Sequence, residues 1–207
     1  MSKNINDIFS SEEFRNNMIQ LREETQDSYQ EYTNNISTSD MAASAEVCAF
    51  ISALMHLFTP KSVLNLGSGF SSYIIRKTAL TTKTPYVVCV DDDTEWLSKT
   101  RNFLHDKKLT DNNLLSWNEF VMSEHWGQFD LVLHDIGNMD TRTAILPLLS
   151  QLISVKDGIA IIDDVHKTKY RHSVESAFSG PQWILGNHKE ITLDRYNRYA
   201  WSISRSI

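Results

Sequence analysis

The chain has 207 residues, of which 41% are hydrophobic and 22% are charged. This length is typical of one domain, residues 1–207, and the composition provides enough apolar surface for a continuous core. The formal net charge of −6 argues against a nucleic-acid-binding protein, because such proteins usually concentrate Lys and Arg on one surface. A local basic stretch remains, formed by Lys167, Lys169 and Arg171 with His166 and His172 on either side.

The two cysteines, Cys48 and Cys89, both lie in apolar runs. They are expected to be small buried side chains, and neither a disulfide framework nor a zinc site is expected. The N-terminus lacks the apolar core of a signal peptide, and no segment approaches the roughly 18 apolar residues of a membrane span. The sequence therefore predicts a cytoplasmic protein without a membrane partner.

Two helices are predicted before the first strand. Residues 10–32 place Phe14, Met18 and Leu21 on one helical face. Residues 42–58 form a denser apolar helix, for which Ser39 and Asp40 are the expected caps and Pro60 the end. Residues 1–38 are expected to form a helical cap on a Rossmann-like core of residues 39–207.

The rest of the chain alternates short apolar runs with helical segments, which predicts parallel β-α-β units covered on both faces. The expected fold is an α/β, mostly parallel, seven-stranded sheet that ends in an antiparallel hairpin, with the polar turn 194–197 joining the last two strands directly. The expected strands are 62–67, 85–91, 112–117, 129–135, 158–164, 183–193 and 198–204, and the helices between them are 72–80, 95–107, 118–125 and 141–153.

A glycine-rich turn follows the first of these strands. Gly67 and Gly69 would let the backbone turn sharply and approach a ligand, and Asp91 ends the next strand at the position where a carboxylate meets a ribose. A tight structural turn and an exposed strand end are the alternative. NAD would explain the same features, but Ser72 stands where a third glycine would complete the dinucleotide motif.

The order of the motifs VLNLGSGFSS, VVCVDDD, FDLVLHD and GIAIIDD, followed by a hairpin, resembles the class I S-adenosylmethionine-dependent methyltransferases over roughly residues 40–207. The resemblance implies that the glycine-rich turn lies against the methionine part of the cofactor and that Asp91 binds the ribose. It implies that Asp92 and the Trp117–Asn118 region border the adenine. Trp96 is a further candidate to stack nearby, although a tryptophan in a helix is more often a core residue. The implied cofactor contacts are Gly67, Ser68, Gly69, Ser71, Ser72, Asp91, Asp92, Trp117, Asn118 and Asp135.

Three carboxylates, Asp135, Asp163 and Asp164, end two further strands. Because the ligand crevice of an open α/β sheet lies outside the carboxyl ends of its strands, they are expected to face one pocket. Like charges in one pocket repel unless a cation lies between them, and oxygen ligands suit Mg²⁺. The alternative is that only Asp135 or Asp163 meets a ligand while Asp164 caps a turn.

The carboxylate pattern resembles that of metal-dependent O-methyltransferases, more closely the macrocin and novobiocin sugar type than the catechol type. The resemblance implies that Asp135, Asp163 and Asp164 bind a divalent metal that acidifies a substrate hydroxyl. The sequence departs from both types, because Gly137 replaces the catalytic Asp of the sugar enzymes and Asn138 replaces the catechol-type Lys.

A general base must therefore come from elsewhere, and His166 is the first candidate, with a solvated loop histidine as the alternative. Asp135 is the second predicted catalytic residue, and Asp140 and His134 are weaker candidates. His134 precedes Asp135 on a strand, so it is expected to pack or hydrogen-bond on the other face.

The leading hypothesis is an S-adenosylmethionine-dependent methyltransferase that acts on a hydroxyl of a small molecule with the help of a divalent metal. Methyl transfer to nitrogen is a close variant. A protein that binds the cofactor without transferring a methyl group, and an NAD-dependent oxidoreductase, are the alternatives. The apolar face of the N-terminal helix suits a homodimer interface as well as a lid.

Overall fold

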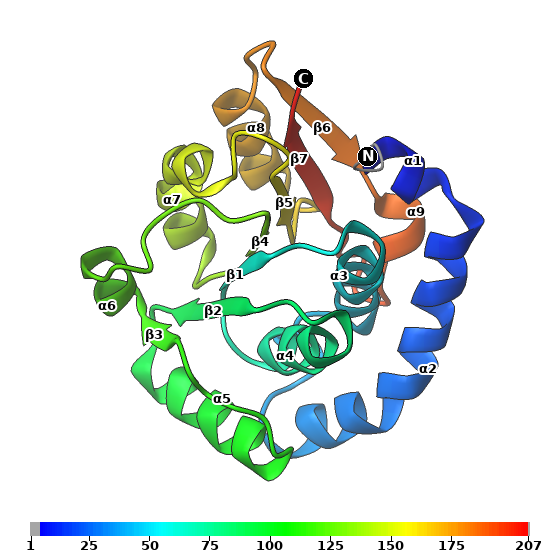
Figure 1. Ribbon diagram of the computed structural model, residues 1–207, viewed down its shortest axis with the longest axis vertical. Coiled ribbons are helices and arrows are strands. Elements are labelled where there is room, and N and C mark those ends of the chain that lie inside the picture. The colour runs from blue at the N-terminus through cyan, green and yellow to red at the C-terminus, as the bar shows by residue number, and fades with distance from the viewer. Residues whose placement is uncertain (1–4, 207) are drawn as a thin grey trace.

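The computed structural model, which describes residues 5–206, contains a seven-stranded sheet in the order β3-β2-β1-β4-β5-β7-β6 (Figure 1). β1 to β5 run parallel, and β7 is antiparallel to both of its neighbours. This confirms the predicted fold class. The strands are β1 Ser62–Leu66, β2 Tyr86–Asp91, β3 Leu114–Ser116, β4 Leu131–His134, β5 Ile159–Ile162, β6 Trp183–Asn187 and β7 Trp201–Arg205.

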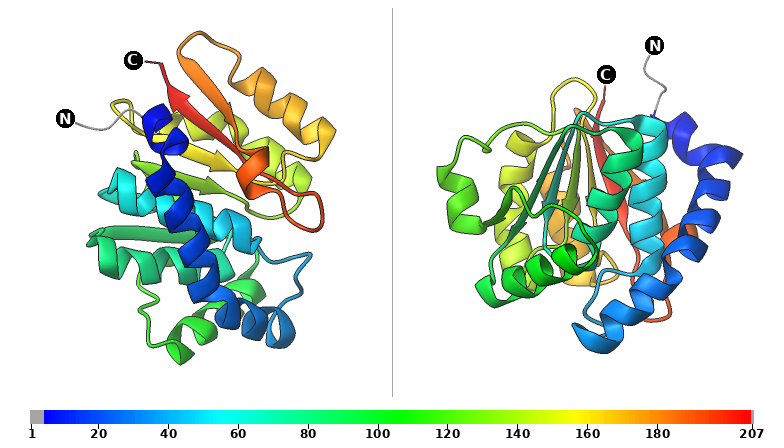
Figure 2. Two further views of the ribbon diagram at one scale, coloured as in Figure 1. Left: turned by 90° about the vertical axis from the view of Figure 1, so that its right-hand side faces the viewer. Right: turned by 60° about the horizontal axis from the view of Figure 1, so that its bottom comes forward.

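The central strands are apolar because helices cover both faces of the sheet. β4 and β5 are buried at every position, and their register pairs Leu131 with Ile159. One face is covered by α3 (Ala45–Phe58), α4 (Phe70–Thr82) and α5 (Thr94–Asp106), and the other by α6 (Trp117–Met122), α7 (Met139–Leu152) and α8 (Thr168–Ala177) (Figure 2).

The strand order reverses at β1, which lies between β2 and β4. The connections that leave β1 and β4 therefore run to opposite faces of the sheet, since α4 and α7 cover different faces. A crevice opens between diverging connections of this kind at the carboxyl ends of the strands. The topology thus places the ends of β1, β2, β4 and β5 around one potential ligand site.

The N-terminal helices form an outer layer on α3. α1 (Ile5–Ser10) leads into α2 (Glu12–Asn35), whose Phe14 and Met18 are buried, as the helical spacing predicted (Figure 2). The predicted cap of α3 was wrong: Ser44 accepts a hydrogen bond from the Val47 amide. α3 begins too late for Ser39 and Asp40 to reach its free N–H groups.

The C-terminal pair β6 and β7 is antiparallel, as expected, but the predicted direct turn between them was wrong. The short helix α9 (Lys189–Thr192) follows β6, stabilised by the Thr192 hydroxyl donating to the His188 carbonyl. A further helix, α8, is not predicted by the sequence pattern; it buries only Tyr170 and Val174 and has no side-chain cap at its N-terminus. Neither the apolar period nor a capping residue therefore marks α8 clearly.

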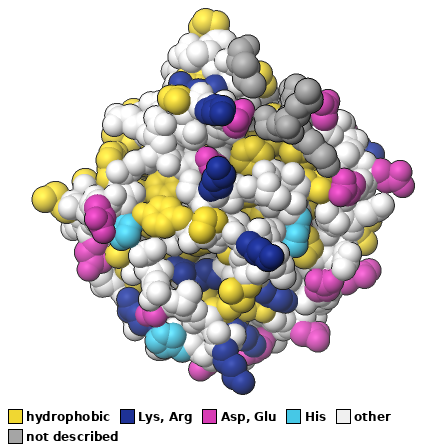
Figure 3. All heavy atoms as spheres, viewed as in Figure 1, with side chains coloured by type: hydrophobic (Ala, Val, Ile, Leu, Met, Phe, Trp, Pro, Cys, Tyr) yellow, Lys and Arg dark blue, Asp and Glu magenta, His cyan; other side chains and the backbone are white. Residues whose placement is uncertain are grey.

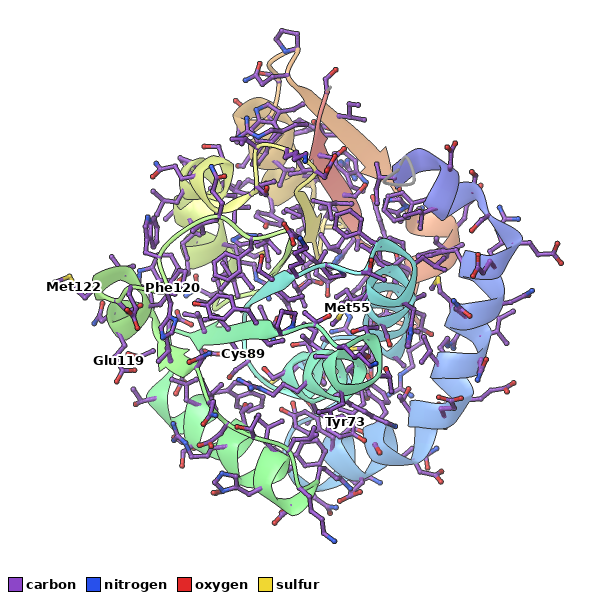
Figure 4. The ribbon with its side chains drawn as sticks, viewed as in Figure 1. Met55, Tyr73, Cys89, Glu119, Phe120 and Met122 are labelled. Atoms are coloured by element: carbon purple, nitrogen blue, oxygen red, sulfur yellow. The ribbon has the colours of Figure 1, made fainter. Side chains whose placement is uncertain are left out.

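Both cysteines are unpaired and buried, as predicted. Figure 4 shows Cys89 within β2, and on α6 it shows Phe120 toward the sheet and Met122 pointing away from it. Among the residues that the structure describes, no helix combines the length and apolarity that crossing a membrane requires. Acidic side chains follow the edge formed by α2, and basic ones are scattered among uncharged ones on the face in Figure 3.

Candidate cofactor and acceptor site

A pocket lies at the carboxyl ends of β1, β2 and β4, where the strand order reverses. Most of the predicted cofactor contacts line it, namely Gly67, Ser68, Gly69, Ser71, Asp91, Asp92 and Asp135. Other elements add Tyr32, Met41, Ala42, Ala43, Phe70, Asp93, Trp96, Gly137, Asn138 and Arg142. The structure therefore brings together residues separated by more than half the chain.

The two glycines after β1 have backbone conformations that side-chain-bearing residues rarely adopt. Gly67 has φ of 108°, and a Cβ atom there would lie 2.7 Å from the Asp135 carbonyl oxygen. Gly69 has φ of 130°, and its Cβ would lie 2.8 Å from the Tyr32 hydroxyl. Both positions require glycine for the turn and for the close approach of neighbouring groups.

Asp91 at the end of β2 holds the glycine-rich turn in place. Its two carboxylate oxygens accept hydrogen bonds from the Ser68 amide at 2.6 Å and the Asp93 amide at 3.1 Å. Burial raises the pKa of Asp91, although these amide hydrogen bonds act in the opposite direction. The carboxylate borders the pocket and has further lone pairs for ribose hydroxyls.

Two aromatic residues complete this side of the pocket. Trp96, for which both a core position and stacking near the adenine were open, lines the pocket and donates from Nε1 to the Ser68 carbonyl at 2.9 Å. Tyr32 comes from α2, is fully buried, and has no hydrogen-bond partner for its hydroxyl among residues 5–206. This hydroxyl lies at the inner edge of the pocket, beside Gly69.

The remaining predicted cofactor contacts lie outside the pocket lining. The Ser72 hydroxyl accepts a hydrogen bond from Nδ2 of buried Asn65 at 3.0 Å. Trp117 packs on Phe120 and Trp126, and Asn118 is exposed at the start of α6. Contact of Ser72, Trp117 and Asn118 with the cofactor stays a prediction.

A loop between α2 and α3 forms the mouth of the pocket, with Met41 exposed there. Arg198 holds this loop: its guanidinium donates to the carbonyls of Ser39, Asp40 and Ala42. The same guanidinium pairs with Asp194 at 2.6 Å. Ser39 and Asp40, suggested by the sequence as helix caps, instead anchor this loop through their carbonyls.

The predicted carboxylate cluster contains a cation from the protein itself. Arg142 in α7 pairs through Nη2 with Asp135 Oδ1 at 2.7 Å and through Nη1 with Asp164 Oδ2 at 2.8 Å. Its Nε is shared by the carbonyl oxygens of Ile136 and Gly137 at 3.2 and 3.3 Å. Asp135 and Asp164 are therefore held together by a nearly buried guanidinium.

Burial and neighbouring charges shift the pKa values of the ionisable groups in this cluster. Burial raises the pKa of Asp135 to about 6, against the opposing charge of Arg142. Burial, and then the charges of Asp164 and Asp135, raise the pKa of Asp163 well above its usual range. Burial tends to lower the pKa of Arg142, but Asp135 and Asp164 raise it overall, so the guanidinium stays charged.

His166 lies beside this cluster. Its Nδ1 is 3.4 Å from Asp164 Oδ1, and neither atom has a hydrogen-bond partner within the described part of the chain. Burial lowers the pKa of His166 despite the nearby Asp164, so the imidazole is neutral at physiological pH. His134, as predicted, is buried away from the pocket, where Nδ1 contacts the Tyr170 hydroxyl at 2.7 Å.

The expected metal site does not fit this arrangement. Residues 5–206 contain no group of three or more His, Cys, Asp or Glu side chains placed to hold a metal ion. Two of the three expected ligands, Asp135 and Asp164, direct carboxylate oxygens to Arg142. Repulsion between the carboxylates did require a cation, but the guanidinium meets that requirement.

Sequence reasoning did not single out Arg142, Tyr32 or Asn65. A signal for Arg142 was present: it lies near the N-terminus of α7, where the helix dipole disfavours a cation. Nearby carboxylates compensate a basic residue at such a position. Tyr32 and Asn65 gave no comparable signal, because each depends on contacts between distant segments.

Comparisons with known proteins support the fold. Neither profiles of protein families nor curated protein sequences give a match to this chain. Among solved structures, the O-methyltransferase from Bacillus cereus with bound S-adenosylhomocysteine is similar at a TM-score of 0.63 and 12% identity, covering 91% of each chain. TomG, the O-methyltransferase of tomaymycin synthesis from Streptomyces achromogenes, was solved with S-adenosylmethionine and gives a TM-score of 0.61 at 11% identity, covering 98% of this chain and 96% of its own.

The methyltransferase PaMTH1 from Podospora anserina, bound to S-adenosylhomocysteine, is similar at a TM-score of 0.60 and 14% identity, over 92% of this chain and 88% of that one. Bacterial and fungal methyltransferases thus share the arrangement over nearly the whole chain. This chain has the Rossmann-like fold of the class I S-adenosylmethionine-dependent methyltransferases.

Proposed function

We propose that this protein is an S-adenosylmethionine-dependent methyltransferase that methylates a hydroxyl of a small molecule. The observation that carries the proposal is the pocket at the reversal of the strand order, which combines the Gly67–Gly69 turn, the Asp91 carboxylate and the end of β4. The similar structures with a bound cofactor or its product support it, and the O-methyltransferases among them favour oxygen as the acceptor.

The residues present suit the cofactor. Asp91 would bind the ribose hydroxyls, and the backbone of Gly67 and Gly69 would lie against the methionine part, near the unpaired Tyr32 hydroxyl. When bound, the cofactor would supply an electrophilic methyl group on a sulfonium. The chain needs chiefly to align a nucleophile with it, because such a methyl group needs little further activation.

The acceptor would enter beside Asp135, Asn138 and Arg142, which line the pocket at the end of β4. Asp135, with its pKa raised to about 6, can accept a proton from a hydroxyl in this position. His166 is the second proposed proton acceptor, because its imidazole is neutral and lies beside the carboxylate cluster. The loop held by Arg198 would exclude water on the opposite side.

The cofactor assignment is tested by isothermal titration of the purified chain with S-adenosylhomocysteine. Wild type should bind in the micromolar range, and Asp91→Ala should bind about ten- to a hundredfold more weakly, since it loses hydrogen bonds to a charged group. Asp106→Ala is the matched control, because this exposed carboxylate ends α5 away from the pocket. Circular dichroism must show that each variant is folded.

Binding of NADH in place of S-adenosylhomocysteine would overturn the proposal in favour of an oxidoreductase. If the cofactor binds, a panel of hydroxylated and amino-bearing small molecules is then assayed for release of S-adenosylhomocysteine. Turnover of hydroxylated compounds supports the proposal. Turnover confined to amines would replace oxygen by nitrogen as the acceptor, and binding without any turnover would favour a cofactor-binding protein.

A further inference from the structure

The position of Arg142 bears on whether this site needs a metal. Its guanidinium lies between Asp135 and Asp164, with ion pairs of 2.7 and 2.8 Å, and its side chain is only 9% exposed. A divalent ion bound through the paired oxygens would displace the arginine, and one bound through the other oxygens of Asp135 and Asp164 would lie close to the guanidinium charge. The guanidinium therefore opposes a metal ion in either position.

Further contacts also fix the position of the Arg142 side chain. It belongs to α7, whose first turn is capped by the Asn138 side chain, and its Nε contacts the carbonyls of Ile136 and Gly137. A guanidinium cannot lose its charge at accessible pH, so a metal ion would have to displace the side chain or approach its full positive charge. Both alternatives disfavour metal binding.

The third expected ligand is directed elsewhere. Asp163 accepts a hydrogen bond from the Asp164 amide at 2.7 Å and is 3% exposed. Asp164 adopts a left-handed backbone conformation, with φ of 59°, which follows the end of β5. Asp164 is thereby placed opposite Arg142 while Asp163 is left out of the ion-paired group.

We propose that Arg142 is the resident cation of this site in place of a divalent metal. The inference rests on the proposed function for the reaction, but its claim about cations stands on the ion pairs alone. It predicts an enzyme that binds no metal here and is not inhibited by chelators.

The test uses Mn²⁺ and the electron paramagnetic resonance signal of the free ion, with protein stripped of metals by EDTA and then freed of EDTA. Wild type should leave the free Mn²⁺ signal unchanged, with and without S-adenosylhomocysteine. Arg142→Lys, which keeps a positive charge, should behave alike. Arg142→Met has a side chain of similar length without charge, so it should expose the carboxylates and reduce the free signal at least tenfold at substoichiometric Mn²⁺.

If wild type binds Mn²⁺ and Asp164→Asn weakens this binding at least tenfold, the proposal is overturned. If Asp164→Asn leaves the binding unchanged, the ion is bound elsewhere, which agrees with the proposal. A folded Arg142→Met chain without Mn²⁺ binding would also overturn it, because the carboxylates would then form no cation site. If Arg142→Met does not fold, the wild-type titration and Arg142→Lys decide the matter.

A second readout becomes available once an acceptor is known. Methyl transfer by wild type should change less than twofold when EDTA is added, and a tenfold loss that Mg²⁺ restores would contradict the proposal. The Mn²⁺ titration needs no acceptor and no turnover. Failure of the methyltransferase assignment and failure of the metal-free assignment are therefore distinguishable.

Discussion

The two ends of the pocket are built on different principles. At β1 and β2, backbone geometry and hydrogen bonds dominate: two glycines turn the chain, and Asp91 accepts from the amides of Ser68 and Asp93. At β4 and β5, ion pairs dominate, because Arg142 joins Asp135 to Asp164. The first end is suited to a fixed cofactor, whereas the second depends on a balance of buried charges.

This difference predicts that steric changes will be most severe at the glycine-rich end. Gly67→Ala should lower the free energy of unfolding by about 3 kcal/mol, because the new Cβ would combine a strained φ with a clash against the Asp135 carbonyl. Urea denaturation measures the change. Gly127→Ala is the matched control, since its Cβ would meet nothing within 4 Å and the change should stay within about 0.5 kcal/mol.

His188 lies outside both ends of the pocket and provides a reference for how the free energy of unfolding depends on pH. Burial lowers its pKa to about 4, so the folded protein excludes a proton that the unfolded chain binds below about 6.5. This contribution to stability is present above pH 6.5 and is lost as the pH falls through 4. Relative to His188→Gln, wild type should lose about 3 kcal/mol across that window.

Thermal and urea unfolding at several pH values measure this difference curve. His188→Gln keeps a polar group near the Ser202 hydroxyl, which contacts His188 Nε2 at 2.7 Å, but it does not titrate. A difference curve that is flat between pH 6.5 and 4 would show that the histidine is solvated, contrary to its 8% exposure.

Loss of one ion pair should weaken the charged end by a smaller amount. Asp164→Asn leaves Arg142 with Asp135 alone and should lower the free energy of unfolding by about 2 kcal/mol, because a nearly buried guanidinium loses a charged partner. Asparagine tolerates the left-handed backbone at this position. The exposed pair of Glu95 and Lys99 on α5 provides the control, and Glu95→Gln should change stability by less than about 0.5 kcal/mol.

The smallest effect is expected for a neutral hydrogen-bond group at the glycine-rich end. Asn65 is fully buried and donates to the hydroxyls of Ser71 and Ser72 at 3.1 and 3.0 Å. Asn65→Ala should cost about 1.5 kcal/mol by urea denaturation and should weaken S-adenosylhomocysteine binding by loosening the turn. If Asn65→Ala lowered the free energy of unfolding by more than Asp164→Asn does, the ion pairs would not be more sensitive to substitution than the hydrogen bonds of the glycine-rich end.

The placement of the glycine-rich end could be predicted because its signals are local. Gly67, Gly69 and Asp91 follow apolar strands at short spacings, and the structure gathers all three around one pocket. The fold class was equally accessible, since the alternation of apolar runs and helical segments directly reflects a covered parallel sheet.

The charged end was harder because its outcome depends on contacts between distant residues. The sequence shows Asp135 and Asp164 as strand ends, but not that Arg142, in the helix between them, reaches both. Likewise, Tyr32 reaches Gly69 only because α2 packs along the core. Short elements such as α9 escape prediction for a related reason, since a single turn shows no apolar period.

The most direct test of this account is a crystal structure of the protein grown with S-adenosylhomocysteine and excess Mg²⁺. The account predicts the ribose at Asp91, the amino-acid end of the ligand beside Gly67 and Gly69, and Arg142 still paired with Asp135 and Asp164 without a metal. A ligand bound elsewhere would contradict the proposed function, and Mg²⁺ between Asp135 and Asp164 with Arg142 displaced would contradict the role assigned to the arginine.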